Sequence, residues 1–397
     1  MQAVEVRIPG EYWDSFIYND RLYLFSLNGD ILVYRWDQLI QSFPIKDDWR
    51  PLFWQFLSRS RAWYAPELQK ILESPKIRQG ISLLIDSMTA VPHTVGETGL
   101  RSALVDVAAS PAHPHTDVEA FYNTLYLSSS KGVHAASLST KLNNRFSIST
   151  DIPAFRVACS LGSMAVAAGS EGMFEQVLAP RGQWQTRSEP AQLSSKPCVA
   201  CSWASFDVIA TSGPRSDGYV AAFAKPSRTR RDEAIVRDAR ELVGVVDAAE
   251  LFPSSSGLLF GEQDLLILAS PSTLLIDSWN PYLRRDNYGA DVGSSLSGQR
   301  QLQVSSLTDD AIDGAATVFG ITVEMDSSLI VIGVDGTIRD FGEPVNWRCF
   351  QRSKRYFNQL HVTHGDHIRV YAFVDDYFMP SELRGPAVRR PSTQPGD

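Results

Sequence analysis

Two apolar runs separated by a glycine-containing turn form the clearest hydrophobic pattern in the chain, at residues 19–37. The first run, LYLFSL at residues 22–27, can bury both faces of an extended strand. Asn28 and Gly29 follow, and both residue types tolerate the positive φ angles of a type I′ hairpin turn. Residues 31–36 then form a second run rich in β-branched and aromatic side chains. We therefore expect a β-hairpin with neighbouring sheets on both faces.

Similar hairpins recur along the chain, so the pattern is a repeat. The later copies occupy residues 123–138, 162–178, 205–224, 264–279, 327–342 and 364–379. Three of their turn glycines, Gly132, Gly172 and Gly218, are 40 and 46 residues apart, close to the ~40 to 50 residues of a four-stranded propeller blade. The last copy is expected to turn near Asp375. Seven hairpins predict an all-β fold, a single β-propeller of seven blades, with six blades as the alternative.

Closure of such a ring requires the two ends of the chain to meet. Residues 3–10, AVEVRIPG, have the composition of a strand and are expected to pair into the last blade, which would remove two free sheet edges. The propeller is then expected to span residues 1–383. Residues 384–397 are polar and rich in proline, which predicts a flexible tail.

Three segments interrupt the repeat. Residues 38–98 change to helical spacing, which predicts a helical insertion after the first hairpin, with helices within residues 47–60 and at 66–72 and a possible strand at residues 81–86. Residues 226–250 and 281–312 are expected to be loop insertions. The first of these loops can also hold a short helix.

The first hairpin ends in Trp36 and Asp37, after an Asp-Gly type turn and alternating apolar residues. This unit resembles the blade core of WD-repeat and related β-propeller proteins, and the resemblance covers most of the chain outside the insertions. It is a resemblance of architecture, because only the first copy ends in Trp-Asp and no Gly-His pair precedes the blades. It implies a rigid disc with a central channel and two loop-bearing faces, which is most often used to hold other proteins.

Charge and cysteine content narrow the functional classes. A formal net charge of -8 provides no general attraction for the phosphates of nucleic acids. The four cysteines are too few and too scattered for a disulfide framework, which fits a reducing compartment. No signal peptide and no run of about 18 apolar residues is found, so we expect a cytoplasmic protein without membrane contact.

Candidate chemistry is sparse. His361, His364 and His367 are close enough in sequence to suggest a metal site, but this spacing does not gather three side chains on one strand face. Cys198 and Cys201 form half of a structural zinc site with no second pair, so they are interpreted as buried apolar residues. The sequence carries no phosphate-binding glycine loop and no nucleophile elbow. It therefore predicts no catalytic residue and no cofactor, and favours a role other than an enzyme.

Two segments are predicted to bind a partner. The first is the helical insertion, through Trp49, Trp54 and Trp63. The second is the basic and aromatic stretch at residues 347–357, which is predicted to act through Arg348, Arg352, Lys354, Arg355 and Tyr356. The same alternation is also typical of an outer blade strand with aromatic side chains inward and basic side chains in water.

These observations favour a non-catalytic scaffold or recognition subunit that binds other proteins within a cytoplasmic complex. Two alternatives remain open at this point. One is an enzyme or small-ligand receptor that uses the central funnel of the propeller. The other is a single-stranded nucleic-acid contact through residues 347–357, where basic side chains can neutralise phosphates and aromatic rings can stack on bases.

Overall fold

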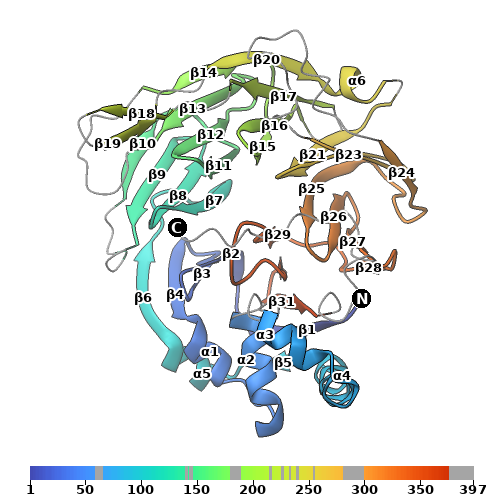
Figure 1. Ribbon diagram of the computed structural model, residues 1–397. Helices are drawn as coiled ribbons and strands as arrows, with labels where there is room; N and C mark the ends of the chain where they lie inside the picture. Colours follow the sequence, from blue (N-terminus) through green and yellow to red (C-terminus); the bar gives the residue numbers. More distant parts are fainter. Residues whose placement is uncertain are drawn as a thin grey trace. The chain divides into compact units, whose positions relative to one another are not determined.

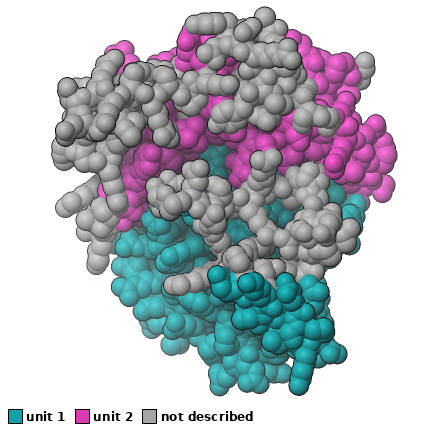
Figure 2. Space-filling model, in the orientation of Figure 1, with its two compact units in different colours: residues 1–110, 316–322, 327–397 teal, residues 111–315, 323–326 magenta. Residues whose placement is uncertain are grey.

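The computed structural model of this 397-residue chain describes most of its length. The described residues are 1–58, 66–138, 142, 146–178, 189–213, 217–224, 228–231, 234–237, 241–253, 255–279 and 299–374. The chain divides into two compact units, coloured in Figure 2. Unit 1 comprises residues 1–110, 316–322 and 327–397, and unit 2 comprises residues 111–315 and 323–326.

Seven sheets of four or more strands account for the blades and confirm the predicted seven-bladed all-β propeller (Figure 1). The alternative of six blades is wrong. Unit 1 contains the first sheet, made of β2 (Tyr12–Tyr18), β3 (Arg21–Ser26), β4 (Asp30–Arg35) and β6 (Leu104–Ala109). Within this sheet the strands pair in chain order, as the hairpin pattern predicts, although the insertion and β5 (His93–Thr94) come between β4 and β6.

The closing sheet, also in unit 1, combines both ends of the described chain. Its strands, in order, are β29 (Asn346–Cys349), β30 (Gln359–Thr363), β31 (His367–Phe373), β1 (Ala3–Pro9) and β5 (His93–Thr94). β1 pairs antiparallel with β31 along its whole length, from Ala3 opposite Phe373 to Pro9 opposite His367. The predicted closure by residues 3–10 is therefore confirmed.

Unit 2 contains four further sheets. They are β7 (Asp117–Phe121), β8 (Thr124–Ser129), β9 (Gly132–Ser137) and β10 (Ser147–Thr150); β11 (Arg156–Ser160), β12 (Ser163–Ala167), β13 (Met173–Val177) and β14 (Ala191–Ser194); β15 (Ala200–Ala204), β16 (Asp207–Thr211), β17 (Gly218–Phe223) and β20 (Leu242–Asp247); and β21 (Leu258–Glu262), β22 (Leu265–Ser270), β23 (Thr273–Ser278) and β24 (Arg300–Gln303). First strands of successive sheets contact one another, β7 with β11, β11 with β15, and β15 with β21.

In the remaining blade, the predicted hairpin forms different strands from those it forms in the other blades. It consists of β25 (Ala311–Thr317), β26 (Gly320–Met325), β27 (Leu329–Gly333) and β28 (Ile338–Asp340). The hairpin predicted at residues 327–342 forms its third and fourth strands, whereas the earlier copies form second and third strands. The turn expected near Asp375 and Asp376 lies outside the described residues, and β31 instead continues from β30 through residues 364–366.

A helical insertion separates β4 from β6, as predicted. It comprises α1 (Trp36–Gln41), the 3₁₀ turn η1 (Asp47–Trp49), α2 (Arg50–Ser58), α3 (Pro66–Leu72), α4 (Pro75–Thr89) and α5 (Glu97–Ala103). The possible strand at residues 81–86 is wrong, because these residues belong to α4. Ile85 and Met88 lie three residues apart on one face of this helix and are both buried.

Strands also occupy the two segments that were expected to be loops. Residues 226–250 contain the hairpin of β18 (Arg228–Arg231) and β19 (Ala234–Arg237), then β20 and the short helix α6 (Ala248–Leu251). The short helix expected in this loop, at residues 232–243, is wrong, since β19 lies within that range and β20 begins at Leu242. β24 falls within residues 281–312, and the predicted tail, residues 384–397, lies outside the described residues.

The turn of the first hairpin differs from the predicted type I′ turn. Gly29 is left-handed, with φ 88°, but Asn28 is not, and the Gly29 N–H donates to the Ser26 carbonyl at 3.0 Å. The β3–β4 connection is therefore a three-residue hairpin loop and not a type I′ turn. The type I′ signature appears instead between β2 and β3, where Asn19 and Asp20 have φ 47° and 59°.

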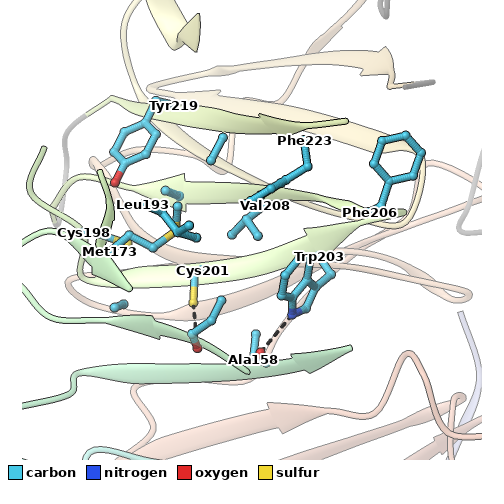
Figure 3. Packing of buried hydrophobic residues seen from close by; sticks show 14 residues of the cluster. Ala158, Met173, Leu193, Cys198, Cys201, Trp203, Phe206, Val208, Tyr219 and Phe223 are labelled. Carbon is cyan, nitrogen blue, oxygen red and sulfur yellow. Dashed lines mark hydrogen bonds between the residues drawn. The ribbon is translucent and has the colours of Figure 1, made fainter. Parts of the chain in front are cut away.

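Buried aromatic and aliphatic side chains hold neighbouring sheets together. Figure 3 shows one such cluster in unit 2, in which Trp203 on β15 donates its Nε1–H to the carbonyl of Ala158 on β11 at 2.8 Å. Cys198 and Cys201 lie in the same cluster, are buried and form no disulfide, which confirms their interpretation as apolar core residues. Burial raises the pKa of the Cys198 thiol to about 12. None of the helices in the described ranges has the length and apolar character needed to span a membrane.

Candidate functional site

A polar surface pocket of about 300 Å³ lies in unit 1, where the β2–β3 turn meets the junction of β4 with α1. We call it the turn pocket. Its lining residues are all polar, namely Asn19, Asp20, Arg21, Arg35, Asp37 and Gln38. Five of the six belong to the first repeat and Gln38 directly follows it, so the stretch that shows the repeat most clearly also builds this pocket.

Asp20 is held in place from the far end of the chain. Its Oδ1 accepts a hydrogen bond from the Tyr356 hydroxyl at 2.9 Å, and its Oδ2 forms an ion pair with Arg355. The hydrogen bond to Asp20 raises the pKa of Arg355, and burial together with the Asp20 charge raises the pKa of Tyr356. Arg355 and Tyr356, two of the residues predicted to bind a partner, therefore hold Asp20 in the wall of the turn pocket.

Asp37 is held by the helical insertion. Its Oδ1 accepts a hydrogen bond from the Ser58 hydroxyl, at the end of α2, at 2.9 Å. The neighbouring Leu57 carbonyl accepts hydrogen bonds from Trp36 Nε1 and Gln359 Nε2, both at 2.7 Å. Because Trp36 and Leu57 are completely buried, these bonds anchor the end of α2 to α1 and to β30.

Two arginines on neighbouring strands of one sheet also line the pocket. Arg21 at the start of β3 pairs in register with Arg35 at the end of β4. Residues directly opposite in an antiparallel pair place their Cβ atoms about 5 Å apart on the same face. Both guanidinium groups are therefore presented to the same region of the pocket, and Arg35 is exposed.

Elsewhere in unit 1, a buried polar network joins the first and last sheets. Arg348 on β29 binds both carboxylate oxygens of Asp14 on β2, at 2.7 and 2.6 Å. Ser15 Oγ lies 3.0 Å from His361 Nδ1, and His361 Nε2 lies 3.1 Å from Gln359 Oε1. Burial lowers the pKa of His361 to about 3, so this imidazole is neutral at pH 7.

The basic and aromatic stretch is not an outer strand, and that interpretation is wrong. β29 lies at one edge of its sheet, with β5 at the other, and it contacts β2; a turn-rich segment follows it. Phe350 packs against Phe16 and His361, with ring centroids at 5.7 and 4.7 Å. The alternation therefore reflects contacts between blades, which the sequence pattern could not distinguish from a half-exposed strand.

The other predicted contact residues are spread over the surface of unit 1. Arg352 is exposed and Lys354 is half-buried. Trp49 and Trp54 are also half-buried, and Lys46 Nζ lies 4.7 Å from the centre of a Trp49 ring. Trp63 lies outside the described residues.

The three histidines do not converge. His361 is committed to Ser15 and Gln359, whereas His364 and His367 stack at the β30–β31 turn with ring centroids 4.7 Å apart. His367 is bound on both ring nitrogens, by Asp366 at 2.6 Å and by Arg369 at 2.8 Å. Across the described ranges, no three His, Cys, Asp or Glu side chains are grouped so that they could hold a metal ion.

Sequence reasoning missed the turn pocket. The only local signal was the polar pair Asn19 and Asp20 between two apolar strands, which marks a tight turn but carries no chemistry by itself. The partners of Asp20 follow 335 and 336 residues later, and nothing in the spacing indicates that they meet it.

Comparison with known proteins supports the architecture. The crystal structure of the β-propeller domain of Cps50 (Swd1) from Myceliophteria thermophila aligns over 92% of this chain and 97% of that domain, with a TM-score of 0.51 and 9% sequence identity. The fold is a β-propeller. At this identity the similarity concerns the fold alone, and it confirms the predicted architectural resemblance to WD-repeat propellers.

Two further solved structures align more weakly. The WD40 β-propeller domain of Doa1 matches 96% of this chain and 95% of its own length, with a TM-score of 0.41 and 8% identity. The CNH domain of AfRom2 matches 66% of this chain and 94% of its own length, with a TM-score of 0.34 and 8% identity. No protein-family model matches the chain, and no curated protein matches its sequence.

Proposed function

We propose that this propeller is a non-catalytic recognition subunit that binds another protein through its helical insertion, within a cytoplasmic complex. The observation that carries the proposal is the apolar surface of α3, α4 and the segment after them. Ile71, Ile77, Leu83 and Val91 are between 41% and 61% exposed there. Large aliphatic side chains gathered on one insertion are typical of a protein contact surface.

The exposed apolar residues of the insertion are distinct from the residues that pack it onto the blades. The insertion contacts the framework through β5, which pairs with β1, and through buried residues of α1, α2 and one face of α4. The outer apolar residues therefore contribute little to folding. We include the half-buried Trp54 and, from the sequence, Trp49 and Trp63 in the proposed contact surface.

Cytoplasmic location is proposed from the cysteines. All four are free thiols, and three of them are buried in the core. Free buried thiols are usual in a reducing compartment, where disulfides rarely persist.

The alternative functions receive less support. Arg348 and Arg355, the central cations of the proposed nucleic-acid contact, form ion pairs with Asp14 and Asp20, so phosphate binding would have to break those pairs. For the funnel alternative, the first strands of unit 2 carry one prominent cation, Arg156, which forms a bidentate ion pair with Asp313. Burial lowers the pKa of Arg156, but Asp313 outweighs it and the net direction is upward. An arginine so engaged is not poised to bind a substrate.

Affinity capture of the full chain from its own cells tests the proposal. We expect a partner of fixed stoichiometry to be recovered with wild type and lost with Leu83→Glu, because Leu83 is 61% exposed on α4. Val107→Glu is the matched control, since Val107 is 50% exposed on β6 of the same unit. Equal recovery with Leu83→Glu and wild type would contradict this contact surface, provided that both variants keep the wild-type circular dichroism spectrum.

A further inference from the structure

The turn pocket contains two arginines at opposed positions of neighbouring strands. Arg21 and Arg35 are directly opposite on β3 and β4 and both line the pocket. Like charges at directly opposed positions destabilise a sheet. An anion bound between them would turn this repulsion into attraction.

The acidic residues of the pocket are already engaged. Both oxygens of Asp20 are taken, one by Tyr356 and one by Arg355, and Asp37 Oδ1 accepts from Ser58. The lining carries two arginines and two aspartates, but the charge of Asp20 is already balanced by Arg355 from outside the lining. The side chain of Arg35 forms no hydrogen bond or ion pair with any other residue in the described part of the chain.

The geometry points to an oxyanion as the ligand. A guanidinium group presents parallel N–H donors that match the two oxygens of a carboxylate or phosphate. Asn19 and Gln38 add neutral side-chain amides at the rim, which can donate to remaining oxygens. We propose that the turn pocket binds a phosphate or carboxylate group between Arg21 and Arg35.

The inference rests on the proposed function, because we expect the oxyanion to be a side chain of the partner protein. The pocket is contiguous with the insertion, since Asp37 and Gln38 belong to α1 and Ser58 belongs to α2. A partner segment lying on the insertion would then place an acidic or phosphorylated side chain in the pocket.

Isothermal titration calorimetry of the full chain tests this site with three probes. These are inorganic phosphate, a short phosphoserine peptide with glycine flanks, and the same peptide with glutamate in place of phosphoserine. We expect at least one probe to bind wild type, and we expect Arg35→Gln to weaken that probe by about tenfold or more, since a charge-assisted hydrogen bond is lost. Arg101→Gln is the control, because Arg101 is 79% exposed on α5 and removes the same charge.

The outcomes separate the sources of the anion. Binding of a peptide but not of inorganic phosphate assigns the oxyanion to a partner segment, and equal binding of phosphate assigns it to a free anion. Absence of binding by all three probes, or equal weakening in Arg35→Gln and Arg101→Gln, overturns the site. Arg21→Gln is a second test and should weaken binding of the same probe. If Arg21→Gln fails to fold, the result with Arg35→Gln decides.

The capture experiment with Leu83→Glu keeps the two proposals apart. If wild type and Arg35→Gln recover the same partner equally while Leu83→Glu does not, the recognition function stands and the oxyanion site is not part of it. If phosphate binds and no partner is recovered, the oxyanion site stands without the scaffold function.

Discussion

Arg348 binds both carboxylate oxygens of Asp14, at 2.7 and 2.6 Å, and so ties the last sheet of the chain to the first. The side chain of Asp14 is 1% exposed and that of Arg348 is 13% exposed. Removing one partner would leave the other charge buried and unpaired, which typically costs more than the pair itself contributes.

We therefore expect Arg348→Ala to lower the free energy of unfolding by about 3 to 5 kcal/mol, measured by urea denaturation. Arg101→Ala is the control, because its pair with Glu97 is fully on the surface and is expected to change stability by less than about 0.5 kcal/mol. Replacing both Asp14 and Arg348 with apolar residues of similar size should recover part of the loss. Similar small effects in both single variants would contradict a stabilising role for the pair.

His361 is expected to make stability depend on pH below neutrality. Its folded-state pKa is about 3, whereas an unfolded histidine titrates near ~6.5. A depressed pKa means that the unfolded chain binds the proton first, so stability is complete above ~6.5 and falls as the pH decreases towards 3. By pH 5 the loss from this residue is about 2 kcal/mol.

Urea denaturation between pH 7 and pH 5 measures this loss in wild type and in His361→Gln. The glutamine variant retains polar groups toward Ser15 and Gln359 but cannot take up the proton. We expect a shallower decline of stability with pH in the variant. An identical slope in both proteins would show that His361 does not control the acid sensitivity.

Asp207 is a second buried link between blades, within unit 2. Its two carboxylate oxygens accept hydrogen bonds from the Phe223 backbone N–H at 2.8 Å and from Trp279 Nε1 at 2.9 Å, and all three residues are buried. Asp207→Ala should lower the free energy of unfolding by about 2 to 5 kcal/mol, because two buried donors lose their acceptor. Asp207→Asn, which keeps one acceptor oxygen, should lose less. Thermal unfolding of the two variants gives the order, and the reverse order would contradict this account.

The closing strand should be stabilised mainly by its buried face. Ile8 on β1 is 0% exposed, and its backbone pairs with Ile368 on β31. Ile8→Ala should cost about 2 to 5 kcal/mol through lost burial and the cavity left behind. Glu11→Ala, just after the strand and exposed, is the control and should be close to neutral. A small effect of Ile8→Ala on urea denaturation would mean that closure contributes little to stability.

Much of the fold could be predicted because its signals are local. The apolar runs at residues 22–27 and 31–36 specify strands by their own periodicity, and residues 3–10 show the same property at the other end of the ring. Turn type was harder to predict. Asn28 and Gly29 suit a type I′ turn, but the ladder between β3 and β4 leaves Leu27 unpaired as well, so a three-residue loop forms. The polar fourth strands were missed because β24, RQLQ, has no apolar alternation to reveal it.

The amino-acid sequence by itself determined that the chain repeats a double-sided hairpin, carries a helical insertion and closes through residues 3–10, since each of these depends on patterns within one segment. Tertiary structure alone decided what the basic and aromatic stretch does. Arg355 and Tyr356 reach Asp20, and Arg348 reaches Asp14, across more than 330 residues of chain. Whether a cation is a surface contact or a structural partner depends on the charge that folding brings beside it, and local periodicity carries no record of that neighbour.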